Sequence, residues 1–310
     1  MKLAFVVDPL DQLKAYKDSS VAMMRAAAAR GHEIHAFEAR QMFVLEGAVR
    51  SKVRALRIND NNEDWYQVTG AAEARLAEFD YVLMRKDPPF DQEYYYATLL
   101  LERAEAEGTR VVNSPRALRD WNEKLAILRF PALAPPTLVA GDMDTVHAFI
   151  DAHRDVIVKK LDGMGGTMIF RVTATDPNRN VIVETLTDTG RRTIMAQRFI
   201  PEIAQGDKRV LVIDGEPFPQ CLARIPKEGE TRGNLAAGGR GVAQPISARD
   251  REIATAVGAE LVKAGIVFAG LDIIGDWLTE VNVTSPTCIV EIEEQTGEDA
   301  AEDLMDALGA

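Results

Sequence analysis

Three oxygen-bearing side chains stand near the end of the chain, in two neighbouring apolar runs. Asp272 interrupts the first run, Phe268 to Ile274, and Glu280 and Asn282 interrupt the second, which begins at Trp277. Short apolar runs around a Gly-Asp turn are typical of a hairpin, and strand alternation places Glu280 and Asn282 on one face. Two carboxylates and an amide form a hard oxygen donor set that suits Mg²⁺ bridging substrate phosphates. The alternative is a solvated polar face on an edge hairpin.

The register of this hairpin decides whether Asp272 joins the other two side chains. A two-residue loop would pair Asp272 with Thr279, which points to the opposite face. A three-residue loop, Gly275-Asp276-Trp277, would pair Asp272 with Glu280 and bring all three oxygen ligands together. We predict the three-residue loop.

A second segment offers an open backbone beside a lysine. Asp155 to Lys160 is typical of a strand, Leu161-Asp162-Gly163-Met164-Gly165-Gly166 of a tight glycine loop, and Thr167 to Val172 of a returning strand. Glycine lets successive N–H groups approach a phosphate, and a lysine on the strand can neutralise its charge. An ordinary hairpin turn is the alternative, since the loop is neither a Walker loop nor a Rossmann turn.

A third segment, residues 225–241, contains five glycines in 17 positions together with Arg232 and Arg240. Such a composition cannot pack a core, and it indicates a mobile lid that attracts anions. A disordered connection is the other interpretation. Arg209 and Arg224, at the ends of nearby apolar strands, have the forked geometry that binds carboxylates or phosphates.

The first part of the chain must supply the scaffold. Leu3 to Val7 predicts a buried strand, and a helix follows from Ser19-Ser20 to Gly31. Tyr81 to Met84 predicts another strand, followed by a helix to Gly108 and a short strand from Arg110 to Asn113. This alternation predicts a mostly parallel α/β sheet over residues 1 to about 120. Ser114-Pro115 is typical of a helix start, and the segments that follow it have the pattern of paired strands. We place the main domain boundary near residue 122.

Composition limits the function classes. The chain has 310 residues, 46% of them hydrophobic, and a net charge of −12, which disfavours nucleic acid and anionic membranes as partners. Only Cys221 and Cys288 are present, with no Cys-x-x-Cys pattern, so we expect two buried structural thiols rather than a disulfide framework or a zinc site. We find no signal peptide and no apolar stretch long enough to span a membrane, and expect a cytoplasmic protein.

The order of these segments resembles that of an ATP-grasp ligase, and several literal strings resemble bacterial glutathione synthetase over nearly the whole chain. The strings are Met84 to Phe90, Leu161 to Gly166, Gly206 to Val210, Ala223 to Pro226, Thr231 to Gly239 and Asn282 to Thr287. The resemblance implies ATP-dependent joining of γ-glutamylcysteine to glycine in a cytoplasmic homo-oligomer, a dimer or tetramer. It also implies an α/β domain over residues 1–121, then two α+β subdomains over residues 122–200 and 201–310 that hold the nucleotide.

Carried over position by position, the resemblance implies the following roles. The nucleotide would be bound by Lys124, Lys159, the loop glycines Gly163, Gly165 and Gly166, the linker Gln197, Arg198, Phe199 and Ile200, and Asp207 beside the ribose. Mg²⁺, with Mn²⁺ as an alternative, would be held by Asp272, Glu280 and Asn282. The dipeptide and the transferred phosphate would be bound by Arg85, Arg209, Arg224 and Arg232, and the last three would assist catalysis under a lid from Ile225 to Arg240.

The chain departs from the family pattern at three positions. Lys160 stands where proline is usual, so the resemblance and not strand alternation selects Lys159. Arg198 replaces a neutral residue, which matters little where only backbone meets adenine. Val290 stands where an arginine is expected, which puts one substrate contact in doubt.

The implied chemistry is phosphorylation of a carboxylate to an acyl phosphate, which the amine of glycine then attacks. Positioning and charge neutralisation would carry this reaction without a side-chain nucleophile. Another ATP-grasp ligase, joining D-alanines or adding glutamate to a protein tail, is an alternative. A synapsin-like regulatory module that binds ATP without catalysis is a second alternative, and fold alone does not separate these functions.

Overall fold

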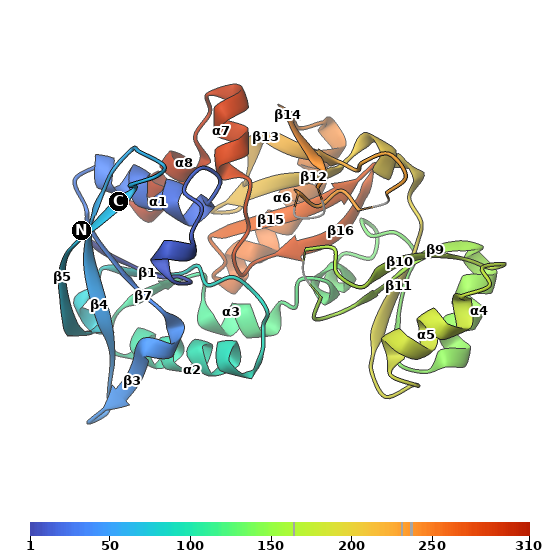
Figure 1. The fold of residues 1–310 in the computed structure, drawn as a ribbon, viewed down its shortest axis with the longest axis horizontal. Coiled ribbons are helices and arrows are strands. Elements are labelled where there is room, and N and C mark those ends of the chain that lie inside the picture. The colour runs from blue at the N-terminus through green and yellow to red at the C-terminus, as the bar shows by residue number, and fades with distance from the viewer. Residues whose placement is uncertain (164, 231, 236–237) are drawn as a thin grey trace.

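The computed structural model describes residues 1–163, 165–230, 232–235 and 238–310. Met164 of the glycine loop, and Thr231, Ala236 and Ala237 of the predicted lid, lie outside the described residues. Within the described residues the strands form three sheets, which Figure 1 shows one after another from the N-terminal region to the four-stranded sheet at the far end. Across these ranges, none of the helices combines the length and the apolar character that a membrane crossing requires.

The N-terminal sheet forms around a strand that is buried on both faces. In β1 (Lys2–Val6), Leu3 and Phe5 pack into one hydrophobic cluster, whereas Ala4 and Val6 pack into another. The strand order is β3-β4-β2-β1-β6-β7, with β5 paired to β4. The other strands are β2 (Glu33–Phe37), β3 (Met42–Leu45), β4 (Ala48–Ile58), β5 (Tyr66–Arg75), β6 (Tyr81–Met84) and β7 (Arg110–Val112). Helices α1 (Ser19–Ala29), α2 (Gln92–Ala106) and α3 (Pro115–Asp120) cover it.

The parallel part of this sheet confirms the α/β prediction, since β1 pairs in parallel with β2 and β6, and β6 with β7. The rest is an antiparallel extension in which β4 pairs with β2, β3 and β5. The sheet is therefore mixed, and the expectation of a mostly parallel sheet holds only for its central strands.

A four-stranded antiparallel sheet follows, in the order β10-β9-β11-β8. Its strands are β8 (Thr137–Ala140), β9 (Asp155–Lys160), β10 (Ile169–Thr173) and β11 (Ile194–Arg198), and α4 (Met143–His153) and α5 (Arg179–Thr187) cover one face (Figure 1). Val156 and Val158 of β9 enter a separate core with residues of both helices. Lys159 follows Val158 in the strand, so its side chain points to the opposite face. That face is directed toward the rest of the molecule, where Lys159 contacts Glu280.

The third sheet has the order β14-β13-β12-β15-β16. Its strands are β12 (Asp207–Ile213), β13 (Glu216–Ile225), β14 (Arg240–Pro245), β15 (Phe268–Ile274) and β16 (Trp277–Asn282), accompanied by α6 (Ala248–Ala264), α7 (Ile289–Thr296) and α8 (Ala300–Leu308). The three sheets fall within the three predicted domain spans, whose boundaries at 122 and 200 stay predictions.

The C-terminal helices return to the N-terminal sheet. The hydroxyl of Tyr81 in β6 donates a hydrogen bond of 2.7 Å to the carbonyl of Leu308, and Arg30 after α1 forms a 2.6 Å ion pair with Glu302. Asn113, just after β7, bonds to the backbone of Phe268 and Val283, which lie at the two ends of the β15–β16 hairpin. The hairpin is thus anchored to the N-terminal domain.

Candidate active site

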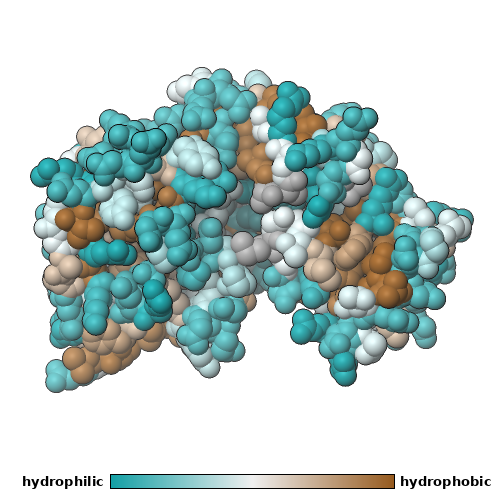
Figure 2. Space-filling view, viewed as in Figure 1, coloured by the Kyte–Doolittle hydropathy of each residue, from teal (hydrophilic) through white to brown (hydrophobic). Residues whose placement is uncertain are grey.

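A cavity of about 340 Å³ lies where the three sheets approach one another. Figure 2 shows the face of the molecule hollowed near its centre, with mainly hydrophilic residues around the hollow. All the site residues predicted above line this cavity except Arg85; they are Lys124, Lys159, Gly163, Gly165, Gly166, Gln197, Arg198, Phe199, Ile200, Asp207, Arg209, Arg224, Arg232, Asp272, Glu280 and Asn282.

The β15–β16 hairpin pairs Asp272 with Glu280, as predicted, but by a different route. Ile274 pairs with Trp277, so the loop contains only Gly275 and Asp276, and the predicted three-residue loop is wrong. The register shifts between Asp272 and Ile273, because Thr279 is an extra residue opposite Asp272. This β-bulge has the same effect as a longer loop, since one added residue returns Glu280 to the face of Asp272.

Asp272 is buried between two arginines. Arg209 Nε lies 2.6 Å from Asp272 Oδ1, and an Arg224 terminal nitrogen lies 2.9 Å from Asp272 Oδ2. Burial alone would raise the pKa of Asp272, but the charges of Arg209 and Arg224 outweigh burial and hold the pKa well below its usual range. Asp272 is therefore an anion at neutral pH.

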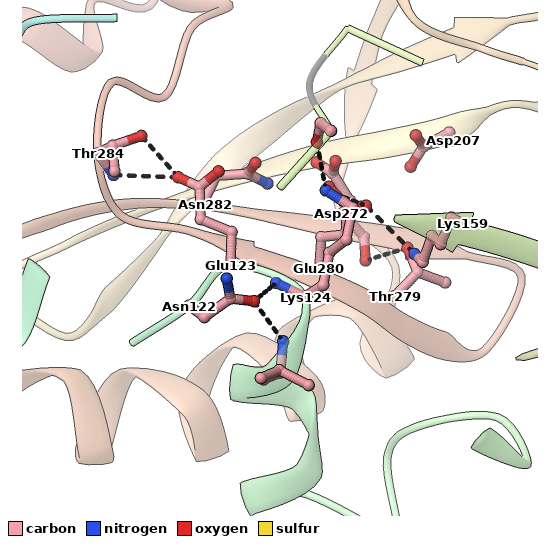
Figure 3. Close-up of polar contacts among 12 residues, drawn as sticks. Asn122, Glu123, Lys124, Lys159, Asp207, Asp272, Thr279, Glu280, Asn282 and Thr284 are labelled. Atoms are coloured by element: carbon pink, nitrogen blue, oxygen red, sulfur yellow. Dashed lines mark hydrogen bonds and ion pairs between the residues drawn. The ribbon is translucent and has the colours of Figure 1, made fainter. Parts of the chain in front are cut away.

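Glu280 meets two lysines on the other side of the cavity (Figure 3). Its Oε1 lies 3.2 Å from Lys159 Nζ and 3.8 Å from Lys124 Nζ. Burial would raise the pKa of Glu280, but the charges of Lys124 and Lys159 lower it. Lys159, and not Lys160, is the buried lysine that lines the cavity.

The donor set fits a hard divalent cation. Within the described residues, no three His, Cys, Asp or Glu side chains are grouped to hold a metal ion, and the Asn282 amide is the third oxygen donor that the sequence predicted beside the two carboxylates. Asn282 pairs with Gly270, two residues along the hairpin from the Asp272–Glu280 pair. Its Nδ2 donates to the Gly270 carbonyl at 3.0 Å. That bond orients the amide and leaves its oxygen available beside two carboxylates.

Residues 197–200 form the link between the second and third sheets. Gln197 Nε2 donates to Thr137 Oγ1 at 3.2 Å, and the Phe199 N–H donates to the Asp155 carbonyl at 3.0 Å. The guanidinium of Arg198 lies 5.4 Å from the ring centre of Trp277, at the turn of the β15–β16 hairpin. The linker is thus fixed from both sheets along one wall of the cavity.

Asp207 is a buried carboxylate with one unused oxygen. Arg224 lies 2.6 Å from its Oδ2, whereas Oδ1 has no hydrogen-bond partner among the described residues. Burial raises its pKa to about 7, and the negative charge of Asp272 adds to the effect while Arg224 opposes it. An unpartnered buried acceptor that lines a cavity is suited to a ligand hydroxyl.

The glycine loop and the lid meet across the cavity. Gly166 has a φ of +80°, and a Cβ there would lie 2.8 Å from Asn234 Oδ1, so only glycine fits. Arg232 of the lid contacts the Gly166 carbonyl at 3.4 Å and Glu230 at 2.6 Å, while Lys124 Nζ donates to the Gly163 carbonyl at 2.5 Å. The resting loop is therefore held by the same cations that were predicted to bind phosphate.

Arg85 lies behind the cavity wall. Its guanidinium is buried and donates to Ser20 Oγ at 3.1 Å and to the Pro286 carbonyl at 2.9 Å. Pro286 itself lines the cavity. In this arrangement Arg85 holds the segment after β16, and its predicted contact with the dipeptide stays a prediction. Val290, where an arginine was expected, lies in the core and does not line the cavity.

Several cavity residues were not predicted from the sequence. Glu123 Oε1 accepts hydrogen bonds from Thr284 Oγ1 at 2.7 Å and from the Thr284 N–H at 3.2 Å (Figure 3). It also accepts one from the Val283 N–H at 3.1 Å. Its position next to Lys124 was the available signal. Asp87 and the segment from Thr284 to Thr287 also line the cavity, and they belong to quoted strings without having been given a role, while Cys288, predicted only as a buried thiol, lines it as well.

Two family models together match most of the chain. The model of the prokaryotic glutathione synthetase N-terminal domain matches residues 1–119, and that of the prokaryotic glutathione synthetase ATP-grasp domain matches residues 123–297. The chain is 59% identical over 302 residues to a glutathione synthetase of Bordetella parapertussis, covering 96% of this chain and 95% of the relative. It is 52% identical over 310 residues to that of Pseudomonas aeruginosa, covering 100% and 98%.

A solved structure of the ATP-grasp ligase PsnB complexed with minimal precursor, Mg and ADP shares the fold. The TM-score is 0.64 at 22% identity, over 99% of this chain and 96% of that one. The matches at 52% identity and above favour the glutathione synthetase interpretation over the two alternatives raised from the sequence.

Proposed function

Because this chain belongs to the prokaryotic glutathione synthetase family and catalyses the ATP-dependent synthesis of glutathione from γ-glutamylcysteine and glycine, we propose that the cavity described above is where all three substrates react. The observation that carries this proposal is the convergence of sixteen of the seventeen predicted residues on one cavity, in which Asp272 pairs with arginines and Glu280 with lysines. The reaction brings two anions together, a triphosphate and a carboxylate, so it needs cationic side chains, and carboxylates that would hold a metal cation.

The nucleotide occupies the side of the cavity formed by the second sheet. The backbone of Gln197 to Ile200 meets the adenine ring, and the free Oδ1 of Asp207 accepts a hydrogen bond from a ribose hydroxyl. Lys124 and Lys159 bind the phosphates together with the N–H groups around Gly163 to Gly166. These lysines contact Glu280 and Gly163 in the present structure, and nucleotide binding exchanges those contacts for phosphate oxygens.

Asp272, Glu280 and Asn282 would hold Mg²⁺, with Mn²⁺ as an alternative. A bound divalent cation would supply neutralisation of phosphate charge during transfer. Arg209, Arg224, Lys124 and Lys159 keep the two carboxylates ionised, and the same four side chains offer positive charge to anionic substrates.

The reaction proceeds through an acyl phosphate. An oxygen of the cysteinyl carboxylate attacks the γ-phosphorus of ATP, and the bond to the β,γ-bridging oxygen breaks as ADP leaves. The amine of glycine then attacks the acyl carbon, and inorganic phosphate leaves with the original carboxylate oxygen. Arg209, Arg224 and Arg232 stabilise the negative charge that develops in both steps, and the lid from Ile225 to Arg240 excludes water from the intermediate.

Isotope transfer tests this chemistry directly. With γ-glutamylcysteine carrying ¹⁸O in its cysteinyl carboxylate, mass spectrometry of the released phosphate should find one ¹⁸O per phosphate formed. Phosphate without the label would overturn the acyl-phosphate route, while glutathione formation in the same tube reports the overall reaction independently.

Two further features belong to this proposal. A symmetric homo-oligomer, either a dimer or a tetramer, is supported by the general preference of enzymes for closed symmetric assemblies, and light scattering would measure its mass. A reducing cytoplasmic location is supported by two buried cysteines, both free thiols.

A further inference from the structure

The acidic side chains of the cavity differ in whether they already have a partner. Among the described residues, Asp272 and Asp207 pair with arginines, Glu280 pairs with lysines, and Glu123 accepts three hydrogen bonds from Val283 and Thr284. Asp87 also lines the cavity, yet within the described part of the chain it has no cation within 4.0 Å of its carboxylate. One carboxylate of the site therefore remains open to a cationic group.

The backbone of Asp87 is fixed, and the neighbouring cations are occupied. Its N–H donates to Asp8 Oδ2 at 3.0 Å, and Lys86 Nζ lies 3.0 Å from Asp8 Oδ1. Lys86 also donates to the Asp87 carbonyl at 3.0 Å, so its charge is directed to Asp8 and to backbone. The Arg85 guanidinium points to Ser20 and Pro286 instead. Asp87 stays exposed to solvent where it lines the cavity, and partial burial raises the pKa of its carboxyl against the opposing effects of the Ser285 hydroxyl and the Arg85 charge.

Asp87 lies a short distance along the cavity wall from the reacting groups. Its carboxylate is beside the hydroxyl of Ser285, and the next residue is Pro286. A Cβ on Gly270 would lie 3.0 Å from the Pro286 side chain and 2.7 Å from Arg209 Cδ, so Pro286 and Arg209 are neighbours. Through Ser285 and Pro286, Asp87 and Arg209 belong to one continuous stretch of the cavity wall.

The dipeptide has a matching charge away from its reacting end. γ-Glutamylcysteine carries its only ammonium group on the α-carbon of the glutamyl residue, and that nitrogen is seven bonds from the carboxyl carbon that reacts. The separation is about two residues of extended chain, so the two ends of the dipeptide would contact different parts of the cavity wall. We propose that Asp87 binds the α-ammonium group of the γ-glutamyl residue while Arg209 and Arg224 hold the cysteinyl carboxylate.

This assignment rests on the proposed placement of the reacting carboxylate, and the chemistry of the second substrate favours it. The amine of glycine must lose its proton before it can attack, and a neighbouring carboxylate would stabilise the protonated, unreactive form. The α-ammonium of the dipeptide takes no part in bond formation, so a fixed carboxylate there improves binding without obstructing the chemistry. Asp87 is accordingly a specificity-determining residue.

The experiment compares wild type and one variant, each with γ-glutamylcysteine and with one substrate analogue. Asp87→Asn keeps the shape and removes the charge, and N-glutarylcysteine is the dipeptide without its α-amino group. Asp87→Asn should raise the KM for γ-glutamylcysteine by about 10- to 100-fold with kcat changed less than about twofold. Wild-type enzyme should show a similar rise in KM with N-glutarylcysteine, and the variant should show little further rise with it. Asp87→Glu, which retains the charge, should restore part of the affinity.

Glu93→Gln is the matched control, because it removes one negative charge from the same region at an exposed position that does not line the cavity. It should leave all three KM values unchanged. The assignment is overturned if the ratio of the KM for N-glutarylcysteine to the KM for γ-glutamylcysteine is the same in Asp87→Asn as in wild type. It is also overturned if the KM for glycine rises instead. The ¹⁸O transfer at saturating dipeptide should persist in Asp87→Asn, so failure of this inference is distinguishable from failure of the acyl-phosphate route.

Discussion

Asp272 and Glu280 face each other across the β15–β16 hairpin because Thr279 forms a bulge between them and the turn. The Thr279 hydroxyl donates to the Asp272 carbonyl at 3.0 Å, which fixes the extra residue in place. The two carboxylates are neutralised by different partners, arginines from β12 and β13 for Asp272 and lysines from the second domain for Glu280. One hairpin therefore gathers cations from the third sheet and from the region of the second sheet around the cavity where we propose that phosphate is transferred.

Glu280→Gln should lower turnover by about 10²- to 10³-fold, because it removes an anionic metal ligand and leaves Lys159 and Lys124 without their partner. Initial rates measured over a range of Mg²⁺ concentrations should show that excess metal does not restore activity. Glu260→Gln is the control, since that carboxylate pairs with Lys263 on an exposed helix surface. A Glu280→Gln enzyme with wild-type turnover and a native circular dichroism spectrum would refute the metal site.

Arg232→Ala should affect turnover far more than nucleotide affinity. The guanidinium belongs to the proposed lid and contacts the Gly166 carbonyl, which places its charge beside the glycine loop that we propose binds phosphate. We expect kcat to fall by about 10²-fold or more and the KM for ATP to change by less than about threefold. Arg191→Ala, which removes an exposed arginine paired with Asp188, should leave both unchanged. Equal losses in kcat and ATP affinity would contradict a role confined to the transition state.

Much of the site was predictable from local sequence because its residues recur in strings with strand periodicity. The tight glycine loop follows from its composition, and the side-by-side placement of Glu280 and Asn282 follows from alternation along one strand, whereas the choice of Lys159 over Lys160 depended on the family resemblance. The bulge at Thr279 was not predictable, because a longer loop and an added strand residue produce the same register between Asp272 and Glu280.

Other features depend on contacts that sequence reasoning does not reach. Strand β5 is exposed along most of its length and contains Gly70, Ala71 and Ala72, which have low β-propensity, so pairing with β4 alone determines it. Arg85 was expected to bind substrate, but its guanidinium is engaged by Ser20 and by Pro286, some 200 residues later. Long-range packing of this kind decides which of several arginines faces a cavity.

Asn113→Ala should destabilise the fold by about 3–5 kcal/mol. The buried amide donates to the carbonyls of Phe268 and Val283 and accepts from the N–H groups of Val267 and Phe268. Alanine would leave these buried backbone groups without partners. Urea unfolding followed by circular dichroism should show a clearly lower midpoint, whereas Asn62→Ala, at an exposed contact with Arg25, should not. Equal midpoints would show that this joint between the domains contributes little.

Asp207→Asn should flatten the dependence of thermal stability on pH. The folded protein binds a proton at Asp207 with a pKa of about 7, raised from 3.8 mainly by burial, so it holds more protons there than the unfolded chain between these values. The associated stability is present below pH 3.8 and is lost as the pH rises through 7. Between pH 5 and pH 8 the wild-type melting temperature should therefore fall by about 2 °C or more beyond that of the variant. Asp276→Asn, at an exposed turn, should follow the wild type. If the melting temperatures of wild type and Asp207→Asn changed equally with pH across this range, Asp207 would already be ionised well below neutral pH.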